Sequence, residues 1–178
     1  MRIGKTKIEV GTADISSMSV NGIVNPANTM LWLGGGVSSE LRKAGGASIE
    51  TEALAKAPAE IGRAVVTGAG KLGARWIIHA VITGQDLEVT EPALRKAVRS
   101  SLEAADSLTC GSLAIPMLVG DFFAHFEIHI AARIIVEETV KYLVNDNKTI
   151  EYVVFVEQKR DIREIFEGAL LEMFTKHG

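Results

Sequence analysis

The chain has 178 residues, 47% of them hydrophobic and 23% charged, which is enough for one globular domain with a sizeable core. Its net charge of −3 and its pI near 5.8 argue against a nonspecific nucleic-acid binder, which normally carries a basic excess. The single cysteine excludes an internal disulfide and a cysteine-rich zinc site. Because no apolar run reaches the roughly 20 residues of a membrane span, we expect a cytoplasmic protein that does not insert into membranes.

Strand-like and helical patterns alternate along the chain. Runs of β-branched residues predict strands, and apolar residues at helical spacing predict the helices between them. In chain order, the predicted elements are strands at 6–10 and 22–25, helices at 38–44 and 48–57, strands at 63–68 and 75–83, a helix at 90–105, a strand at 112–118, a helix at 128–143, a strand at 150–156 and a helix at 162–174. Continuous apolar strands joined by crossover helices indicate a mostly parallel sheet covered on both faces. We therefore predict a three-layer α/β/α sandwich that forms a single domain over residues 1–178, since no linker or internal repeat interrupts the pattern.

The segment "IVNPANTMLWLGGGV" at residues 23–37 places two asparagines and three glycines between a strand and a helix. In α/β folds, ligands bind beyond the carboxyl ends of strands, where loops meet helix N-termini. Glycines let backbone N–H groups approach an anion, and asparagine has donors and an acceptor suited to ribose hydroxyls. The alternative is that Asn25 and Asn28 stabilise turns while the glycines form a flexible surface loop. The segment matches neither a P-loop nor the spaced dinucleotide fingerprint.

Four motifs, in this order, resemble those of the macro domain, which is an ADP-ribose-binding module. They are "TADI" at 12–15, "IVNPAN" at 23–28, "GGGV" at 34–37 and "GAGKLGARWIIHAV" at 68–81. The family pattern has a Gly-Asp-Ile segment, an Asn-Ala-Ala-Asn motif, a Gly-Gly-Gly-Val loop and a Tyr-Val-Ile-His strand, and the resemblance spans residues 7–174. It implies an α/β/α sandwich with a central mixed, mostly parallel sheet, in agreement with the pattern of the elements.

The resemblance also implies the positions of a ligand site. Asp14 matches the aspartate that accepts a hydrogen bond from the adenine amino group, although outside the motif it would be assigned to an ordinary turn. Ile15 matches a residue that lines the adenine pocket. Asn28 matches the asparagine that contacts the distal ribose, and Asn25 is expected to hold the loop in shape. The loop expected to close over the distal ribose and the diphosphate consists of Gly34, Gly35, Gly36 and Val37.

A second phosphate-binding loop departs from the family pattern. In "PMLVGDFFAHFEIH" at 116–129, only Gly120 remains of the family's glycines. Asp121 would repel a diphosphate if its carboxylate faced the ligand, whereas pointing outward it would leave the main-chain donors available. The phenylalanines of this loop are candidates for stacking on a base or ribose, covering the cleft, making an oligomer contact or packing in the core. The candidate ligand-binding residues of the loop are Val119, Gly120, Asp121, Phe122 and Phe123.

Two further departures concern catalysis and adenine binding. Hydrolytic members carry aspartate directly after Gly-Gly-Gly-Val and histidine a few residues later, but here Ser38 and Arg42 occupy those positions. Serine lacks a pKa suited to acid–base work at neutral pH, and Glu40 is expected to point elsewhere from its helix. Glu157 stands where many members place an aromatic residue that stacks on adenine, so Phe155 or the altered loop would have to supply that contact.

These patterns leave three functions open. The first is a module that recognises free or protein-linked ADP-ribose. The second is a hydrolase of O-acetyl-ADP-ribose, of an ADP-ribosyl ester or of ADP-ribose 1″-phosphate, in which Asn28 positions a water as the catalytic candidate. The third is a macro fold that has lost nucleotide binding and acts through an oligomer surface. We expect no cofactor and no metal, because His125 and His129 lack a defined third ligand, and we assign His79 a structural role.

Overall fold

The computed structural model describes residues 1–120, 123 and 125–176 of the chain. These residues form a seven-stranded sheet with the strand order β1-β2-β7-β6-β3-β5-β4. The five inner strands pair in parallel, whereas β1 and β4 run antiparallel along the two edges. This arrangement confirms the predicted mixed, mostly parallel sheet. The strands are β1 Arg2–Ile3, β2 Thr6–Gly11, β3 Gly22–Asn28, β4 Ala64–Gly68, β5 Trp76–Thr83, β6 Ser112–Pro116 and β7 Tyr152–Val156.

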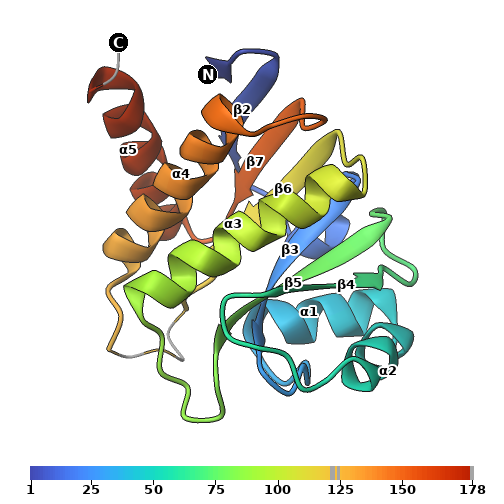
Figure 1. The fold of residues 1–178 in the computed structure, drawn as a ribbon. Coiled ribbons are helices and arrows are strands. Elements are labelled where there is room, and N and C mark those ends of the chain that lie inside the picture. Colours follow the sequence, from blue (N-terminus) through green and yellow to red (C-terminus); the bar gives the residue numbers. More distant parts are fainter. Residues whose placement is uncertain (121–122, 124, 177–178) are drawn as a thin grey trace.

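Helices cover both faces of the sheet and complete the predicted three-layer sandwich (Figure 1). Successive residues of one strand serve opposite layers: Ile77 packs in the core shared with α1 and α2, and Ile78 in the core shared with α3, α4 and α5. Both side chains are fully buried, as expected for a strand covered on both faces. The helices are the 3₁₀ turn η1 Ile15–Ser17, α1 Gly36–Gly45, α2 Ser48–Ala55, α3 Glu91–Ser107, α4 Ile128–Asn145 and α5 Arg160–Lys176.

Helix α3 begins where the sequence predicts. The Thr90 hydroxyl oxygen accepts a hydrogen bond from the backbone N–H of Ala93, which satisfies one of the unpaired donors of the first turn. Within the described part of the chain, no helix combines the length and the apolarity needed to cross a bilayer.

Strand β3 is longer than the pattern predicts, because it continues past Pro26 to Asn28. A proline has no N–H to donate, so a strand tolerates it only where no ladder bond is lost. β3 is paired with β6 only at Gly22 and Ile23, whereas its pairing with β5 continues to Asn28. The β6 side of β3 is therefore open around Pro26, and Pro26 lines the cavity that forms there.

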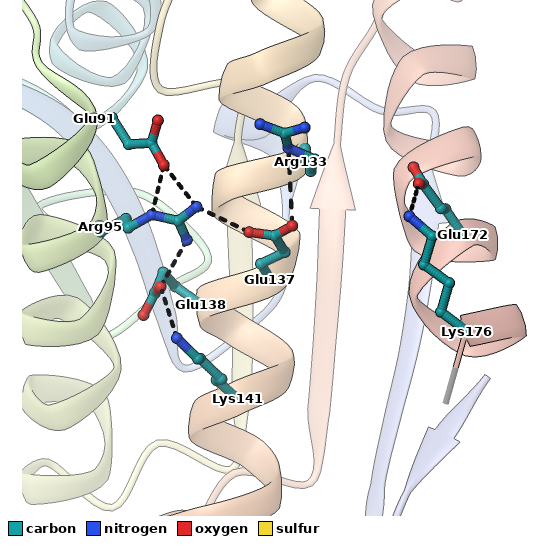
Figure 2. Close-up of polar contacts among 8 residues, drawn as sticks. All are labelled: Glu91, Arg95, Arg133, Glu137, Glu138, Lys141, Glu172 and Lys176. Atoms are coloured by element: carbon teal, nitrogen blue, oxygen red, sulfur yellow. Dashed lines mark hydrogen bonds and ion pairs between the residues drawn. The ribbon is translucent and has the colours of Figure 1, made fainter. Parts of the chain in front are cut away.

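An ion-pair cluster ties α3 to α4 on one face of the sandwich. The Arg95 guanidinium of α3 bonds Glu91 in its own helix and Glu137 and Glu138 in α4, each at 2.8–2.9 Å (Figure 2). Burial opposes the positive charge, but the bonds to the three carboxylates outweigh it and raise the pKa of Arg95. Glu138 is the most enclosed partner, with its side chain 10% exposed.

Replacing Arg95 with methionine is expected to lower the free energy of unfolding by about 2 kcal/mol, between the values typical of exposed and of buried ion pairs. The loss arises because three carboxylates would then face one another without the central cation. Urea unfolding at low salt measures it, and added Glu138→Gln should recover part of the loss. The matched control is Arg160→Met, whose partner Glu164 lies on an exposed surface; an equal loss there would contradict the prediction.

Candidate functional site

A cavity of about 540 Å³ opens at the carboxyl ends of β3, β5, β6 and β7 and at the first turn of α1. This is the edge of a parallel sheet at which α/β proteins bind ligands. The volume lies within the range of small-molecule sites. Residues from several separate stretches meet there, chiefly the end of β3 with the glycine loop that follows it, the loop after β6 and the end of β7 with the loop that follows it.

The structure brings most of the predicted ligand residues to this cavity and places the others behind or beside it. Asn25 and Val119 are buried and do not line it, and the exposed Asp14 lies between the lining residues Ala13 and Ile15. Asp121 and Phe122 lie outside the described residues. The predicted residues that line the cavity are Ile15, Asn28, Gly34, Gly35, Gly36, Val37, Gly120 and Phe123.

Asn28 both closes a turn and faces the cavity. Its side-chain oxygen accepts a hydrogen bond from the Met30 N–H (3.0 Å), and its Nδ2 donates to the Trp32 carbonyl (3.2 Å). Gln85, from the loop after β5, donates from Nε2 to the same Asn28 oxygen at 3.5 Å. Of the two alternatives for this residue, the structure therefore shows the turn directly and leaves one amide hydrogen of Nδ2 for a ligand.

Asn25 lies three residues before Asn28 in β3 and belongs to a buried chain of hydrogen-bonded polar side chains. The Ser38 hydroxyl donates to Asn25 Oδ1 (3.0 Å), and Asn25 Nδ2 contacts His79 Nδ1 (3.1 Å). His79 Nε2 in turn contacts Thr67 Oγ1 (2.9 Å), and Thr67 donates to the Gly68 carbonyl. This chain runs from the first turn of α1 to the edge strand β4. It supports the expectation that Asn25 has a shaping role.

The partners in this chain set the protonation of His79. Asn25 Nδ2 is only a donor, so His79 Nδ1 accepts, and the ring proton sits on Nε2 facing Thr67. Burial lowers the pKa of His79 to about 4, so the ring is neutral at pH 7. A second proton would place two donors, Nδ1–H and Asn25 Nδ2–H, against each other. His79 therefore holds β3 and β5 in position as a neutral side chain.

Ser38 is held in the same chain in a way that bears on catalysis. Its hydroxyl lies 3.0 Å from Asn25 Oδ1 and 3.1 Å from the Pro26 carbonyl oxygen. Both neighbours are acceptors, so the single hydroxyl hydrogen is directed into the fold. A serine nucleophile needs a base that takes this hydrogen. Here His79 is separated from Ser38 by Asn25.

Two positions of the glycine loop that lines the cavity favour glycine for different reasons. Gly36, the first residue of α1, has φ +55°, a left-handed conformation that favours glycine, and no atom lies within 4 Å of the place where its Cβ would be. At Gly34 the indole of Trp32 lies against the backbone, since a Cβ there would lie 2.1 Å from Trp32 Cζ3. The start of the loop is fixed by Glu50 of α2, which accepts from the Leu33 N–H (2.7 Å).

Acidic side chains gather at the β2–β7 end of the cavity. Glu40 and Glu157 line it, and Asp14 lies close enough to act on Glu40. Burial and the negative charges of Asp14 and Glu157 raise the pKa of Glu40. Glu40 stands four residues after Gly36, so both lie on the same face of α1, and Glu40 lies at the Asp14 end of the cavity.

Comparison with known proteins decides the family. The macro domain model matches residues 24–135, more than half of the chain. The chain belongs to the macro domain family. A protein of Aquifex aeolicus is 37% identical to it over 164 residues, which are 92% of this chain and 97% of that protein. A longer relative from Mycobacterium tuberculosis is 34% identical over 134 residues, and the match covers 37% of its length.

Solved macro domains share this fold. The Oceanobacillus iheyensis macrodomain with ADP superposes with a TM-score of 0.85 at 27% identity, covering 99% of this chain and 96% of that one. A variant of the same protein with ADPR superposes with a TM-score of 0.81 at 27% identity, covering 94% and 92%.

In this macro domain the structure separates the two aromatic side chains considered for stacking on adenine. Phe155, a candidate for stacking on adenine, is fully buried and stacks on Phe166 with ring centroids 5.2 Å apart, so it cannot face a ligand. Phe123 lines the cavity instead. Within the described ranges, no three histidine, cysteine or carboxylate side chains come together in a way that could hold a metal ion.

Sequence reasoning did not assign several lining residues of this macro domain, among them Trp32, Thr83, Leu87 and Lys159. Trp32 had a signal, because it stands between the asparagine and glycine motifs in a chain with only 6% aromatic residues. Thr83 ends β5, Leu87 follows β5 and Lys159 follows β7, and only the pairing of strands in the sheet brings them to the cavity.

Gly34→Ala is expected to displace the Trp32 indole while changing the free energy of unfolding by less than about 1 kcal/mol. The ring has room to swing because Trp32 is 41% exposed. Emission of Trp32 in a Trp76→Phe background, which leaves one tryptophan, should therefore shift to longer wavelength. Gly168→Ala on α5 is the control, because its Cβ would meet nothing within 4 Å. An unshifted spectrum for Gly34→Ala would contradict the packing described above.

Proposed function

We propose that this macro domain binds ADP-ribose in the cavity at the carboxyl ends of its parallel strands. The observation that carries the proposal is the convergence of Asn28 and the segment from Gly34 to Val37 on one cavity of about 540 Å³. The similarity to the Oceanobacillus iheyensis macrodomain, solved with ADP and as a variant with ADPR, gives further support.

The diphosphate is assigned to the first turn of α1. The backbone N–H groups at a helix N-terminus lack intrahelical partners, and the helix dipole favours negative charge there. Gly35 and Gly36 line the cavity at this position, and no Cβ stands between their backbone and a ligand. Gly120 also lines the cavity, and its backbone offers a further contact.

The adenine is assigned to the end near Asp14 and Ile15. Asp14 Oδ1 accepts hydrogen bonds from the Ser16 hydroxyl and backbone N–H, and these bonds lower the pKa of Asp14. The carboxylate is therefore ionised at neutral pH, and its second oxygen remains outside the turn to accept from an amino group. Phe123 is assigned the aromatic contact that the family pattern places at Glu157.

Binding, rather than hydrolysis, is the activity that the geometry favours. The hydroxyl of Ser38 donates into the fold, and the raised pKa of Glu40 belongs to a carboxyl at the Asp14 end, away from the ribose assigned to Asn28. We expect no turnover of O-acetyl-ADP-ribose, of an ADP-ribosylated carboxylate or of ADP-ribose 1″-phosphate. Sustained turnover that Asn28→Ala abolishes would favour the hydrolase.

Calorimetric titration with ADP-ribose tests the proposal. We expect saturable binding in the micromolar range, weakened about tenfold or more by Asp14→Ala, because a hydrogen bond to a charged acceptor is lost. Asp14→Asn keeps an acceptor for the Ser16 turn while removing the charge, so it separates a ligand role from a turn role. Asp161→Ala, on the first turn of α5, is the control. Absence of binding by the unmodified protein would leave the fold without nucleotide recognition.

We also propose the domain organisation, the form of the ligand and the cellular compartment. We assign the 178 residues to a single binding domain that recognises ADP-ribose either free or attached to a protein, and we place it in the cytoplasm because of its single cysteine. A pull-down with automodified, ADP-ribosylated protein, competed by free ADP-ribose, distinguishes the attached form from the free one.

A further inference from the structure

The end of the cavity beside Asn28 has a wall of its own, in which Trp32 and Leu87 line the cavity and Gln85 braces Trp32 from outside the lining. Trp32 is 41% exposed and Leu87 is 36% exposed, and both line the cavity. The Trp32 indole Nε1 donates to Gln85 Oε1 at 3.4 Å, and Gln85 Nε2 reaches Asn28 Oδ1 at 3.5 Å. The loops after β3 and β5 are thus joined around the asparagine assigned to the distal ribose.

Two residues next to or within this wall have strained backbone conformations. Leu31 and Leu87 have φ values of 60° and 59°, two of the three left-handed conformations of non-glycine residues in the described ranges. Leu31 directly precedes Trp32 and is 1% exposed, so its side chain anchors the turn in the core. Such conformations persist only where the surrounding structure enforces them, and they gather at functional sites.

Charge distinguishes the two ends of the cavity. Of the described lining residues only Lys159 is cationic, and it follows β7, which β6 and β3 separate from β5 in the sheet. A phosphate ester beside Trp32 would have no cationic side chain to pair with among these residues, and the backbone donors of the first turn of α1 are assigned to the diphosphate. An aromatic ring there would instead bury apolar surface against the indole.

We infer that the wall of Trp32, Gln85 and Leu87 selects ligands whose distal ribose carries a planar organic base, and disfavours a further phosphate at that position. The inference rests on the proposed function, since it takes the ribose to lie at Asn28. Stacking on Trp32 and apolar contact with Leu87 provide the affinity, and Gln85 holds the indole in position by accepting the hydrogen bond from Trp32 Nε1.

The test uses three probes that differ only beyond the distal ribose: ADP-ribose, NAD⁺, which carries a nicotinamide ring, and ADP-ribose 1″-phosphate. In Trp76→Phe protein, Trp32 is the remaining tryptophan, so its fluorescence reports directly on the wall. We expect NAD⁺ to bind at least as tightly as ADP-ribose and to quench Trp32 more strongly. ADP-ribose 1″-phosphate should bind about tenfold more weakly.

Variants separate stacking from general effects on the cavity. Trp32→Ala should weaken NAD⁺ binding about tenfold, as expected for loss of base–aromatic stacking, while changing ADP-ribose binding less than about threefold. Trp32→Phe should restore most of the NAD⁺ affinity. Leu54→Ala, an exposed apolar residue of α2 outside the cavity, should change neither.

Each outcome decides between the inference and the proposed function. Equal weakening of all three probes by Trp32→Ala, or binding of the 1″-phosphate as tight as that of NAD⁺, would overturn the inference while ADP-ribose binding still supports the function. Binding of NAD⁺ without binding of ADP-ribose would support the wall and overturn the function. Failure of all three probes to bind would overturn both.

Discussion

Acidification from pH 6.5 to pH 4 is expected to lower the free energy of unfolding by about 3 kcal/mol through His79 alone. Burial lowers the pKa of this ring to about 4 in the folded protein, whereas in the unfolded chain it returns to its ordinary value of 6.5. Between these values the unfolded state binds a proton that the folded state does not. The contribution of His79 is therefore fully present above pH 6.5, declines as the pH falls, and is lost by about pH 4.

Urea unfolding at several pH values in this window, with a glutamine variant, measures the effect. Glutamine in place of His79 cannot titrate, yet it keeps an acceptor for Asn25 and a donor for Thr67. His79→Gln should be less stable than the native protein at pH 7 and should lose about 3 kcal/mol less on going to pH 4. His129→Gln on the exposed surface of α4 is the control. Parallel pH profiles for the native protein and His79→Gln would rule out this explanation.

Asp106→Ala is expected to lower the free energy of unfolding by about 3 kcal/mol. The carboxylate lies near the end of α3, is 8% exposed, and accepts four hydrogen bonds of 2.6–3.0 Å. The donors are the Tyr142 hydroxyl of α4, the backbone N–H groups of Lys148 and Thr149, and the Thr149 hydroxyl. Alanine would remove the acceptor that these donors share, and with it the link between α3, α4 and the loop that leads into β7.

The pH dependence of Asp106 differs from that of His79, so the two effects can be separated. Burial alone would raise the pKa of Asp106, but the bonds from Tyr142, Thr149 and Lys148 outweigh burial and lower it below 3.8. Its contribution is therefore present above pH 3.8 and is lost only at more acidic pH. Tyr142→Phe should lose about 1 kcal/mol, and adding it to Asp106→Ala should cost less than the sum of the two changes. Strict additivity would argue against one shared network.

The two networks lie on different parts of the fold and bear differently on function. The hydrogen-bonded chain that contains His79 ends at Ser38, which lines the cavity. Protonation of His79 is therefore coupled, through Asn25, to the first turn of α1. The Asp106 network joins α3, α4 and the loop before β7 and lines no part of the cavity. We therefore expect His79→Gln to weaken ADP-ribose binding measurably and Asp106→Asn to leave it unchanged while the protein remains folded.

Much of the fold was predictable because its determinants are local. Apolar runs such as "WIIHAVIT" of β5 mark strands buried on both faces, and Thr90 followed by glutamate and proline marks the start of α3. Pro26 was the exception: a proline is typical of a strand end, but β3 continues past it because β6 has already stopped pairing there. That tolerance depends on a neighbouring strand and has no local sequence signal.

Short stretches of sequence specify the elements, their order and the segment that carries the site, because hydrophobic periodicity, caps and the spacing of asparagines and glycines are local properties. Which side chains meet depends instead on how the strands assemble into the sheet. Asn25 contacts His79, 54 residues away, and Trp32 contacts Gln85, 53 residues away, because β3 and β5 pair in parallel. Strand register sets such pairs, and register is fixed by the assembled sheet and not by any single strand.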